Sequence, residues 1–288
     1  MYLGATPIFV DSEISTWNIC PKALEEAIVD RISKGKKPKA IIPVHLYGMP
    51  YKVDEVGAVA QKYSIPIIED AAESLGSTYK SKNCGTFGEF AALSFNGNKI
   101  ITTSGGGALV CADKESKDKT VYYSTQARDA APHYQHTEVG FNYRMSNISA
   151  GIGRGQMIVL DEHVGLRREM FHFYKSIFET IDQVEVFTEP DNDFFSNHWL
   201  SAITVRPEPT KGISREDLRL HLDQYNIESR PLWKPMHLQP VFEKMPFYGG
   251  QVAEHLFEVG LCLPSGSNLT DEERTRIKKA ILEFFQNK

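Results

Sequence analysis

The stretch that decides the fold occupies residues 65–107 and reads IPIIEDAAESLGSTYKSKNCGTFGEFAALSFNGNKIITTSGGG. It opens with an apolar run at residues 65–68, which is too short for a helix and is followed by Glu69 and Asp70. Such a run predicts a buried strand of a parallel sheet. A second apolar run at residues 91–95 predicts the neighbouring strand.

Polar side chains follow both predicted strands, and Lys99 comes shortly after the second of them. A third strand is expected after the glycine triplet at residues 105–107. Groups at the carboxyl ends of neighbouring parallel strands converge on one crevice, where open α/β sheets bind ligands. Asp70 and Lys99 in one crevice indicate cofactor chemistry. A lysine amine forms a Schiff base with an aldehyde, and pyridoxal phosphate (PLP) enzymes pair that lysine with an acid.

The pattern E-D-A-A-E, then S-F-x-x-x-K, then three glycines, resembles the sugar aminotransferases of the DegT/DnrJ/EryC1/StrS family. These are PLP enzymes of the aspartate-aminotransferase fold, fold type I. The resemblance implies that Lys99 binds PLP covalently and that Asp70 pairs with the pyridine nitrogen. It also places Glu73 near the phenolic oxygen of the ring and the Ser94 hydroxyl on the phosphate.

Each of these residues alone also has an ordinary interpretation. A carboxylate at a strand end commonly caps a helix, and most lysines are surface charges. The functional interpretation is favoured because two spacings match together, from Asp70 to Glu73 and from Ser94 to Lys99. His45, in the run V-H-L-Y-G, has the side chain that titrates nearest neutral pH. A structural role at a strand end is favoured for His45, so it is not among the catalytic candidates.

A second family signature occupies residues 136–162, HTEVGFNYRMSNISAGIGRGQMIVLDE. Taken alone, G-F-N-Y-R is a polar and aromatic loop, or a tight turn, that leads into a helix from Met145. By resemblance, Asn142 in this motif reaches across a dimer interface to the PLP phosphate of the partner. The resemblance therefore implies a symmetric homodimer with a shared active site.

A third signature, R-P-L-W-K-P-M-H, lies in residues 227–242. Prolines preclude a regular helix there, so an ordered loop is expected, and such loops often carry specificity. A proline-stiffened connector is the alternative. The run resembles family members that act on UDP-linked 4-keto-6-deoxy amino sugars. That resemblance implies a nucleotide-sugar site lined by Arg230, Trp233, Lys234 and His237.

The order of elements predicts an α/β protein of the PLP-dependent transferase fold type I. Its central sheet should be mainly parallel, with helices on both faces, because strands and helices alternate along the chain. A smaller α+β domain is expected at the C-terminus, which divides the chain into a PLP-binding large domain, 1–164, and a small domain, 165–288. The expected elements of the large domain are strands at 7–10 and 39–44 and helices at 20–35 and 53–63. Those of the small domain are a strand at 198–205 and helices at 166–181, from Ser214, and at 271–286.

Composition narrows the class further. The 288 residues are 41% hydrophobic and 24% charged, as in a globular protein, and the net charge of −5 argues against a nucleic-acid surface. No apolar run reaches the length of a membrane span, and no signal peptide is recognisable at the start. The four cysteines lack the spacing of a metal site. These features predict a cytoplasmic protein without a metal, nucleic-acid or membrane partner.

The predicted function is transfer of an amino group from an amino acid, with glutamate as the expected donor, to a nucleotide-linked sugar. The acceptor is the C4 ketone of a 4-keto-6-deoxy sugar, for surface polysaccharide or glycan precursor synthesis. Family members carry a segment before the equivalent of residue 1, with a Gly-Thr turn for the phosphate and an aromatic for the ring. A truncated, inactive or split-protein remnant is therefore one alternative. A PLP-dependent sugar dehydratase is another, but in those relatives a histidine replaces the lysine, whereas Lys99 is present here.

Overall fold

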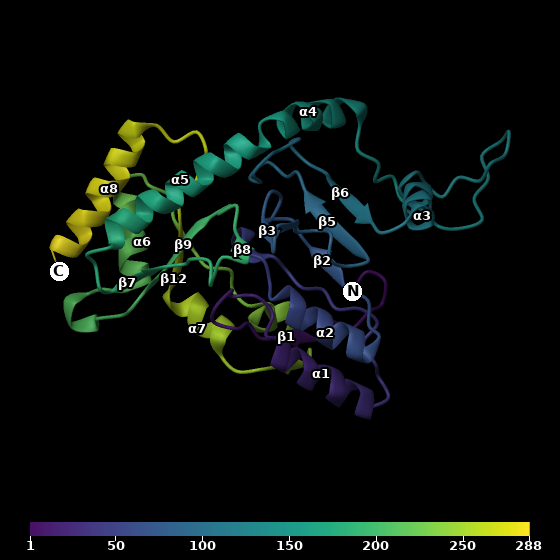
Figure 1. Ribbon diagram of the computed structural model, residues 1–288, viewed down its shortest axis with the longest axis horizontal. Coiled ribbons are helices and arrows are strands. Elements are labelled where there is room, and N and C mark those ends of the chain that lie inside the picture. Colours follow the sequence, from purple (N-terminus) through teal and green to yellow (C-terminus); the bar gives the residue numbers. More distant parts are fainter. Residues whose placement is uncertain (288) are drawn as a thin grey trace.

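The computed structural model describes residues 1–287, and its first half is built on a three-stranded sheet in the order β2-β5-β6 (Figure 1). The strands are β2 (Ile68–Asp70), β5 (Phe90–Ser94) and β6 (Gly107–Cys111). β2 and β5 are parallel, whereas β6 runs antiparallel to β5 and places Gly107 opposite Ser94. The glycine triplet therefore lies at the same sheet edge as the carboxyl end of β5.

The strand predicted at residues 39–44 is present only as isolated pairings, so the prediction of a continuous strand there is wrong. Two parallel bridges join this segment to the region of β2: Ile41 to Ile67 and Val44 to Asp70. Pro43 lacks an N–H and cannot donate to a ladder, although its carbonyl accepts from Asp70 N–H at 2.9 Å. The chain is thus placed beside β2 as expected, but without an uninterrupted ladder.

The register of β2 differs from the prediction in a way that matters for the site. The strand was expected at residues 65–68, with both carboxylates after it, but it covers Ile68–Asp70 and includes them. Successive side chains of a strand point to opposite faces of the sheet. The side chains of Glu69 and Asp70 therefore point to opposite faces of β2.

Two helices that were predicted from their apolar periodicity lie side by side against this half of the molecule (Figure 1). They are α1 (Pro21–Ser33) and α2 (Val53–Tyr63). Proline occupies the first position of α1, where a missing N–H costs no hydrogen bond. Leu24 and Ile28 of α1 pack with Val56 and Val59 of α2 in one buried cluster.

The N-terminal strand is tied to a distant segment. β1 (Phe9–Val10) pairs in parallel with β11 (Phe247–Tyr248), which precedes α7 (Val252–Val259). Asp11 follows β1 and is 2% exposed. Its carboxylate accepts from the first N–H groups of α7, those of Val252 at 3.0 Å and Ala253 at 2.9 Å. A side chain near the start of the chain therefore caps a helix near its end.

We expect Asp11→Ala to lower the free energy of unfolding by about 2 kcal/mol, because two partly buried N–H groups at the start of α7 lose a buried acceptor. Urea unfolding followed by circular dichroism measures the loss. Asp113→Ala is the matched control, since Asp113 caps the N-terminus of α3 (Lys114–Ser124) from an exposed position and should cost less. Equal losses in the two variants would contradict the claim that the buried Asp11 cap stabilises the fold more than the exposed Asp113 cap.

The second half contains an antiparallel sheet in the order β10-β12-β9-β7. Its strands are β7 (Val184–Val186), β9 (Ser201–Val205), β10 (Arg230–Pro231) and β12 (Gly260–Leu263). Three helices accompany it: α5 (Leu160–Phe178), α6 (Arg215–Gln224) and α8 (Asp271–Gln286). Ser214 caps α6 and α8 has the predicted bounds. The core between them includes Tyr174, Ile203, Leu218 and Ile281.

The predicted division after residue 164 falls inside α5, which runs across it without a break. α4 (Asn147–Ile158) precedes α5 almost directly, so the two helices extend along both halves (Figure 1). One buried cluster also contains side chains from either side of residue 164. Among them are Trp17, Tyr47 and Ile101 from the first part and Trp199 and Cys262 from the second. The two parts share a core exactly where the site is built.

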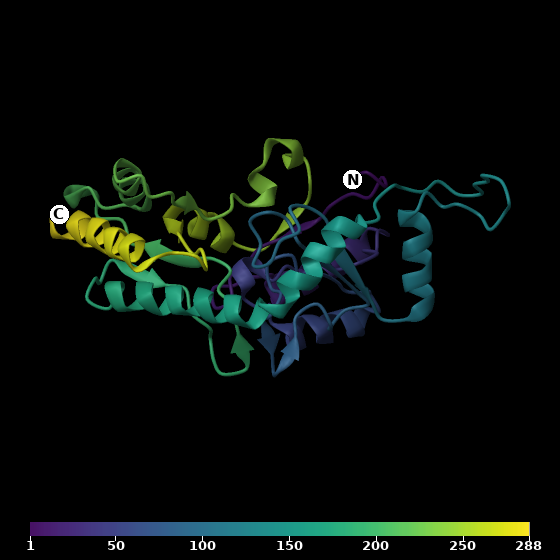
Figure 2. The same ribbon diagram turned by 90° about the horizontal axis from the view of Figure 1, so that it is seen from above.

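The remaining elements are short strands, short turns and one projecting helix. A small sheet joins β3 (Thr78–Tyr79) to β4 (Lys82–Asn83) and β8 (Phe194–Phe195). Short 3₁₀ turns are η1 (Leu46–Gly48), η2 (Pro209–Lys211), η3 (Met236–Leu238) and η4 (Pro240–Phe242). α3 and the loop after it project from the body as an arm (Figure 2). No helix within the described residues has both the length and the apolar character that a membrane span needs.

Candidate active site

Lys99 lies in the turn after β5, where it meets an acid and an aromatic ring. Its Nζ is 3.5 Å from Glu73 Oε1 and 4.2 Å from the centroid of the Trp199 ring. The side chains of Lys99 and Glu73 are only 13% and 12% exposed. A lysine cation over a tryptophan face is attracted by the ring quadrupole, more strongly when water is excluded. Lys99 thus lies between Glu73, which the sequence places in the site, and Trp199, which it does not.

Glu73 is held at both carboxylate oxygens. While Oε1 faces Lys99, Oε2 accepts from Tyr47 N–H at 2.8 Å. Burial raises the pKa of Glu73 above its ordinary value, the charge of Lys99 and the Tyr47 N–H oppose that rise, and the charge of Asp70 adds to it. Asp70 is therefore within electrostatic reach of Glu73, and the Glu73 carboxyl takes up a proton more readily than an ordinary one.

Glu73→Gln should change how stability depends on pH. Because the pKa of Glu73 is raised above 4.5 in the folded chain, the folded state binds that proton more tightly than the unfolded state. Stability from this group is present below 4.5 and is lost as the pH rises through the folded pKa. We expect the variant to lose less stability than the wild type over this interval, measured by urea unfolding at successive pH values. A wild-type slope in Glu73→Gln would refute the assignment.

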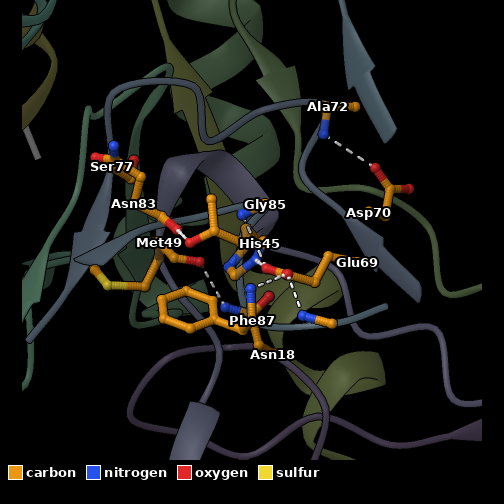
Figure 3. Close-up of polar contacts among 12 residues, drawn as sticks. Asn18, His45, Met49, Glu69, Asp70, Ala72, Ser77, Asn83, Gly85 and Phe87 are labelled. Carbon is orange, nitrogen blue, oxygen red and sulfur yellow. Dashed lines mark hydrogen bonds and ion pairs between the residues drawn. The ribbon is translucent and has the colours of Figure 1, made fainter. Parts of the chain in front are cut away.

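Asp70 and Ser94 stand on neighbouring strands at the same sheet edge, and both are partly exposed. Asp70 Oδ1 accepts from Ala72 N–H at 3.1 Å (Figure 3). Ser94 Oγ accepts from Asn96 N–H at 3.3 Å, and Gly107 lies opposite Ser94. The space around Gly105 is open. A half-buried hydroxyl and a carboxylate therefore lie on neighbouring strands, and the glycine turn lies opposite the hydroxyl, at the end of β5 that leads to Lys99.

The Glu69 carboxylate points away from Asp70 into a buried network on the other face of β2 (Figure 3). It accepts from the N–H groups of Gly85 at 2.9 Å, Phe87 at 2.5 Å and Gly88 at 2.7 Å. His45 Nε2 lies 2.9 Å from it, and neither side chain is exposed. Burial would raise the pKa of Glu69, but the hydrogen bonds from His45 and the backbone outweigh it and lower the pKa. His45 is part of this support, as its structural interpretation predicts.

The loop within residues 227–242, for which a sugar-binding role is predicted and which we call the sugar loop, reaches the Lys99 site through Trp233. Its N–H donates to Tyr47 Oη at 2.8 Å, and its ring lies 5.6 Å from the Tyr47 ring and 6.4 Å from the Trp199 ring. The exposed Lys234 follows Trp233 directly. Tyr47 and Trp199 thus connect this loop to the partners of Lys99.

Two other predicted residues of the loop have partners elsewhere. Arg230 Nε donates to Glu228 Oε1 at 2.7 Å on the surface. His237 Nε2 lies 2.9 Å from Glu254 Oε1, and the His237 ring stacks on Phe247 at 3.7 Å. The side-chain contacts of Arg230 and His237 therefore do not involve Lys99, Glu73 or Trp199.

Asn142 lies on the arm and is exposed. It forms an antiparallel bridge with Thr125, just after α3. The neighbouring Phe141 N–H donates to Tyr123 O at 2.7 Å, and Tyr143 N–H donates to Ser124 O at 3.0 Å. These bonds fold the loop of the arm back onto the C-terminal end of α3 and leave Asn142 exposed, and among residues 1–287 it forms no hydrogen bond with Lys99, Glu73 or Trp199.

Three residues of the site were missed from the sequence: Tyr47, Asn197 and Trp199. Asn197 Nδ2 donates to Glu73 O at 2.9 Å, and its Oδ1 accepts from Trp199 N–H at 2.8 Å. Trp199 Nε1 donates to Asn98 O at 2.8 Å, beside Lys99. Asn197 and Trp199 lie in the polar and aromatic run S-N-H-W at residues 196–199, which overlaps the start of the predicted strand at 198–205, and Tyr47 lies in the run V-H-L-Y-G.

Comparison with known proteins settles the family. The family model described as the DegT/DnrJ/EryC1/StrS aminotransferase family matches residues 1–282. The chain belongs to this family. EpsN of Bacillus subtilis (strain 168), which bears the name of a pyridoxal phosphate-dependent aminotransferase, is 48% identical over 289 residues. That match covers 99% of this chain and 73% of EpsN.

Two further similar proteins agree with this. The GDP-perosamine synthase of Escherichia coli O157:H7 is 37% identical over 287 residues, covering 100% of this chain and 75% of that protein. The crystal structure of a DegT DnrJ EryC1 StrS aminotransferase from Brucella abortus superposes with a TM-score of 0.88 at 29% identity. It covers 98% of this chain and 74% of its own. The chain is thus a PLP-dependent sugar aminotransferase of fold type I, which confirms the predicted fold class, enzyme class and cofactor.

Proposed function

We propose that this aminotransferase moves an amino group from glutamate to the C4 ketone of a nucleotide-linked 4-keto-6-deoxy sugar, for surface polysaccharide or glycan precursors. The observation that carries the proposal is the enclosure of Lys99 between Glu73 and Trp199, with Trp233 of the sugar loop on the same aromatic cluster. The resemblance to a GDP-perosamine synthase supports a nucleotide-linked sugar as the substrate class.

The residues at the sheet edge fit PLP. A primary amine enclosed beside an acid suits an aldehyde, and the open glycine turn next to Ser94 suits a phosphate. We assign Lys99 as the covalent attachment, Asp70 to the ring nitrogen, Glu73 to the phenolic oxygen and Ser94 to the phosphate. When bound, PLP accepts the electrons released when the amino donor loses its α-proton.

The chemistry left to the chain is proton transfer and positioning. Once its amine is free, Lys99 removes the proton from Cα of the donor and, in the second half-reaction, delivers a proton to C4 of the sugar. Glu73 Oε1 lies 3.5 Å from Lys99 Nζ, and the attraction between the carboxylate and the amine holds the amine in place. Trp199 covers the Lys99 amine and helps to keep water from this pair, which strengthens the electrostatic interaction between them.

The sugar would bind along the loop that begins at Arg230. Arg230 and Lys234 are exposed cations, which suits the diphosphate of a nucleotide sugar. Trp233 offers a ring 39% exposed, and His237 offers a polar ring edge farther along the loop. We further propose a homodimer in which the exposed Asn142 serves the partner's phosphate.

The proposal is tested by supplying the PLP-loaded chain with ¹⁵N-glutamate and a nucleotide-linked 4-keto-6-deoxy sugar. We expect ¹⁵N on C4 of the product, detected by nuclear magnetic resonance. A nucleotide-linked 3-keto sugar offered in parallel tests the carbon, and ¹⁵N-glutamine tests the donor. Nitrogen transfer to the 3-keto sugar alone would overturn the C4 assignment, and transfer to neither sugar would overturn the substrate class.

A further inference from the structure

Tyr47 joins two parts of the site that come from distant segments of the chain. Its backbone N–H donates to Glu73 Oε2, and its hydroxyl oxygen accepts from Trp233 N–H, both at 2.8 Å. The first bond reaches the carboxylate beside Lys99. The second reaches the backbone of the loop that we propose lines the sugar site, 186 residues later in the chain. Tyr47 therefore contacts both the acid beside Lys99 and the loop proposed to bind the sugar.

The backbone at Tyr47 is held in a conformation that it would not adopt freely. Its φ of 58° is left-handed, which is costly for a residue other than glycine. Leu46 N–H donates to Asn18 Oδ1 at 2.9 Å and fixes the entry to this turn. Gly48 follows at φ +90°, and a Cβ there would lie 1.9 Å from Asn197 Oδ1. The surrounding structure thus determines where the Tyr47 side chain can go.

The side chain itself is enclosed. Tyr47 is 2% exposed, and its ring meets Trp233 on one side and Trp17 on another. The Cys262 thiol lies beside the hydroxyl, and burial raises the pKa of Tyr47 well above its usual value. The phenol is therefore neutral throughout the physiological range. Its oxygen is a fixed acceptor whose loss leaves a partly buried Trp233 N–H without a partner.

We propose that Tyr47 is a positioning residue that holds Trp233 and the sugar loop in register with the Glu73–Lys99 pair. This inference rests on the proposed function for its consequence: the sugar half-reaction depends on the Tyr47 hydroxyl. The donor half-reaction does not, because Glu73 is held by the backbone N–H of Tyr47, which every residue type except proline provides.

Tyr47→Phe separates the two contacts, since it removes the hydroxyl and keeps the N–H. We expect the KM for the nucleotide sugar to rise about tenfold, while the rate of the donor half-reaction, followed by absorbance with the amino acid alone, stays within about twofold. Hydrogen exchange of the chain without substrate should show faster exchange at the Trp233 amide. Tyr174→Phe is the matched control, because it removes an equally buried hydroxyl that donates to Pro264 O at 2.7 Å.

An unchanged exchange rate at Trp233, or a donor half-reaction that slows in parallel with the sugar half-reaction, would overturn the inference. The same pattern of changes in Tyr174→Phe would also overturn it, as a general loss of stability. If the wild type aminated no nucleotide-linked sugar, the proposed function would fail instead. The exchange measurement would still decide whether Tyr47 positions the loop, since it needs neither cofactor nor sugar.

Discussion

Lys99→Ala is expected to lower the rate of sugar amination by at least about a thousandfold, because general-base catalysis alone contributes 10²–10⁴-fold and the variant also lacks the covalent attachment. The amine of Lys99 lies between Glu73 and Trp199. Its loss also leaves a buried carboxyl without a counter-charge. No other amine in these contacts could take over the proton transfer.

Two measurements check this expectation. The first is the amination rate with ¹⁵N-glutamate and the nucleotide-linked sugar. The second is reduction of the PLP-loaded chain with borohydride, followed by peptide mapping, which should label Lys99 in the wild type and nothing in the variant. Lys34→Ala is the control, because Lys34 pairs with Asp30 at 2.8 Å on the exposed face of α1. Turnover retained in Lys99→Ala would refute the assignment.

Glu69→Ala is expected to lower the free energy of unfolding by about 3–5 kcal/mol, the cost of breaking a buried charged network by removing one partner. The variant would leave one buried and two partly buried backbone N–H groups, and the buried His45 ring, without their acceptor. These donors belong to the loop between β4 and β5 and to the turn before Tyr47. The loss would therefore loosen the support beneath the site, not a contact with substrate.

The pH dependence follows from the lowered pKa of Glu69. A carboxyl with a depressed folded pKa contributes stability above its unfolded value of 4.5 and loses it as the pH falls through the folded pKa. The difference between wild type and Glu69→Ala should therefore be largest near neutral pH and shrink in acid. Denaturant unfolding at several pH values measures it, and a difference that grew below 4.5 would contradict the prediction.

Asp70→Ala is the natural comparison, because Asp70 is the next residue and faces the other side of β2. Within residues 1–287 its side chain accepts a single hydrogen bond, from Ala72 N–H, so we expect a stability loss within about 1 kcal/mol. Amination should fall sharply in this variant if Asp70 pairs with the ring nitrogen as proposed. A large stability loss in Asp70→Ala and a small one in Glu69→Ala would reverse the two roles.

Much of the site could be predicted because its parts are close in the sequence. Asp70, Glu73, Ser94 and Lys99 come from two adjacent parallel strands and the turns after them. Short connections between neighbouring strands leave few alternatives for where such residues can meet. The helices α2 and α8 have their predicted bounds for a similar reason, since periodicity and local capping act within a few residues.

The sequence by itself therefore determined the family, the alternation of strands and helices, and the residues that share the edge of β2 and β5. Only the tertiary structure decided which distant side chains complete that edge. Trp199 is hydrogen-bonded to Asn98, 101 residues earlier in the chain, and Tyr47 is hydrogen-bonded to Trp233, 186 residues later. No periodicity in the sequence encodes such distant partners.

The structure also decided that Glu69 and Asp70 face opposite ways, because side-chain direction alternates with every residue and a shift in register reverses it. The orientation of Arg230 and His237 was open as well, since a proline-rich loop has no repeating pattern to set it. Packing across the two halves of the chain, which depends on shape and buried area, fixes these positions.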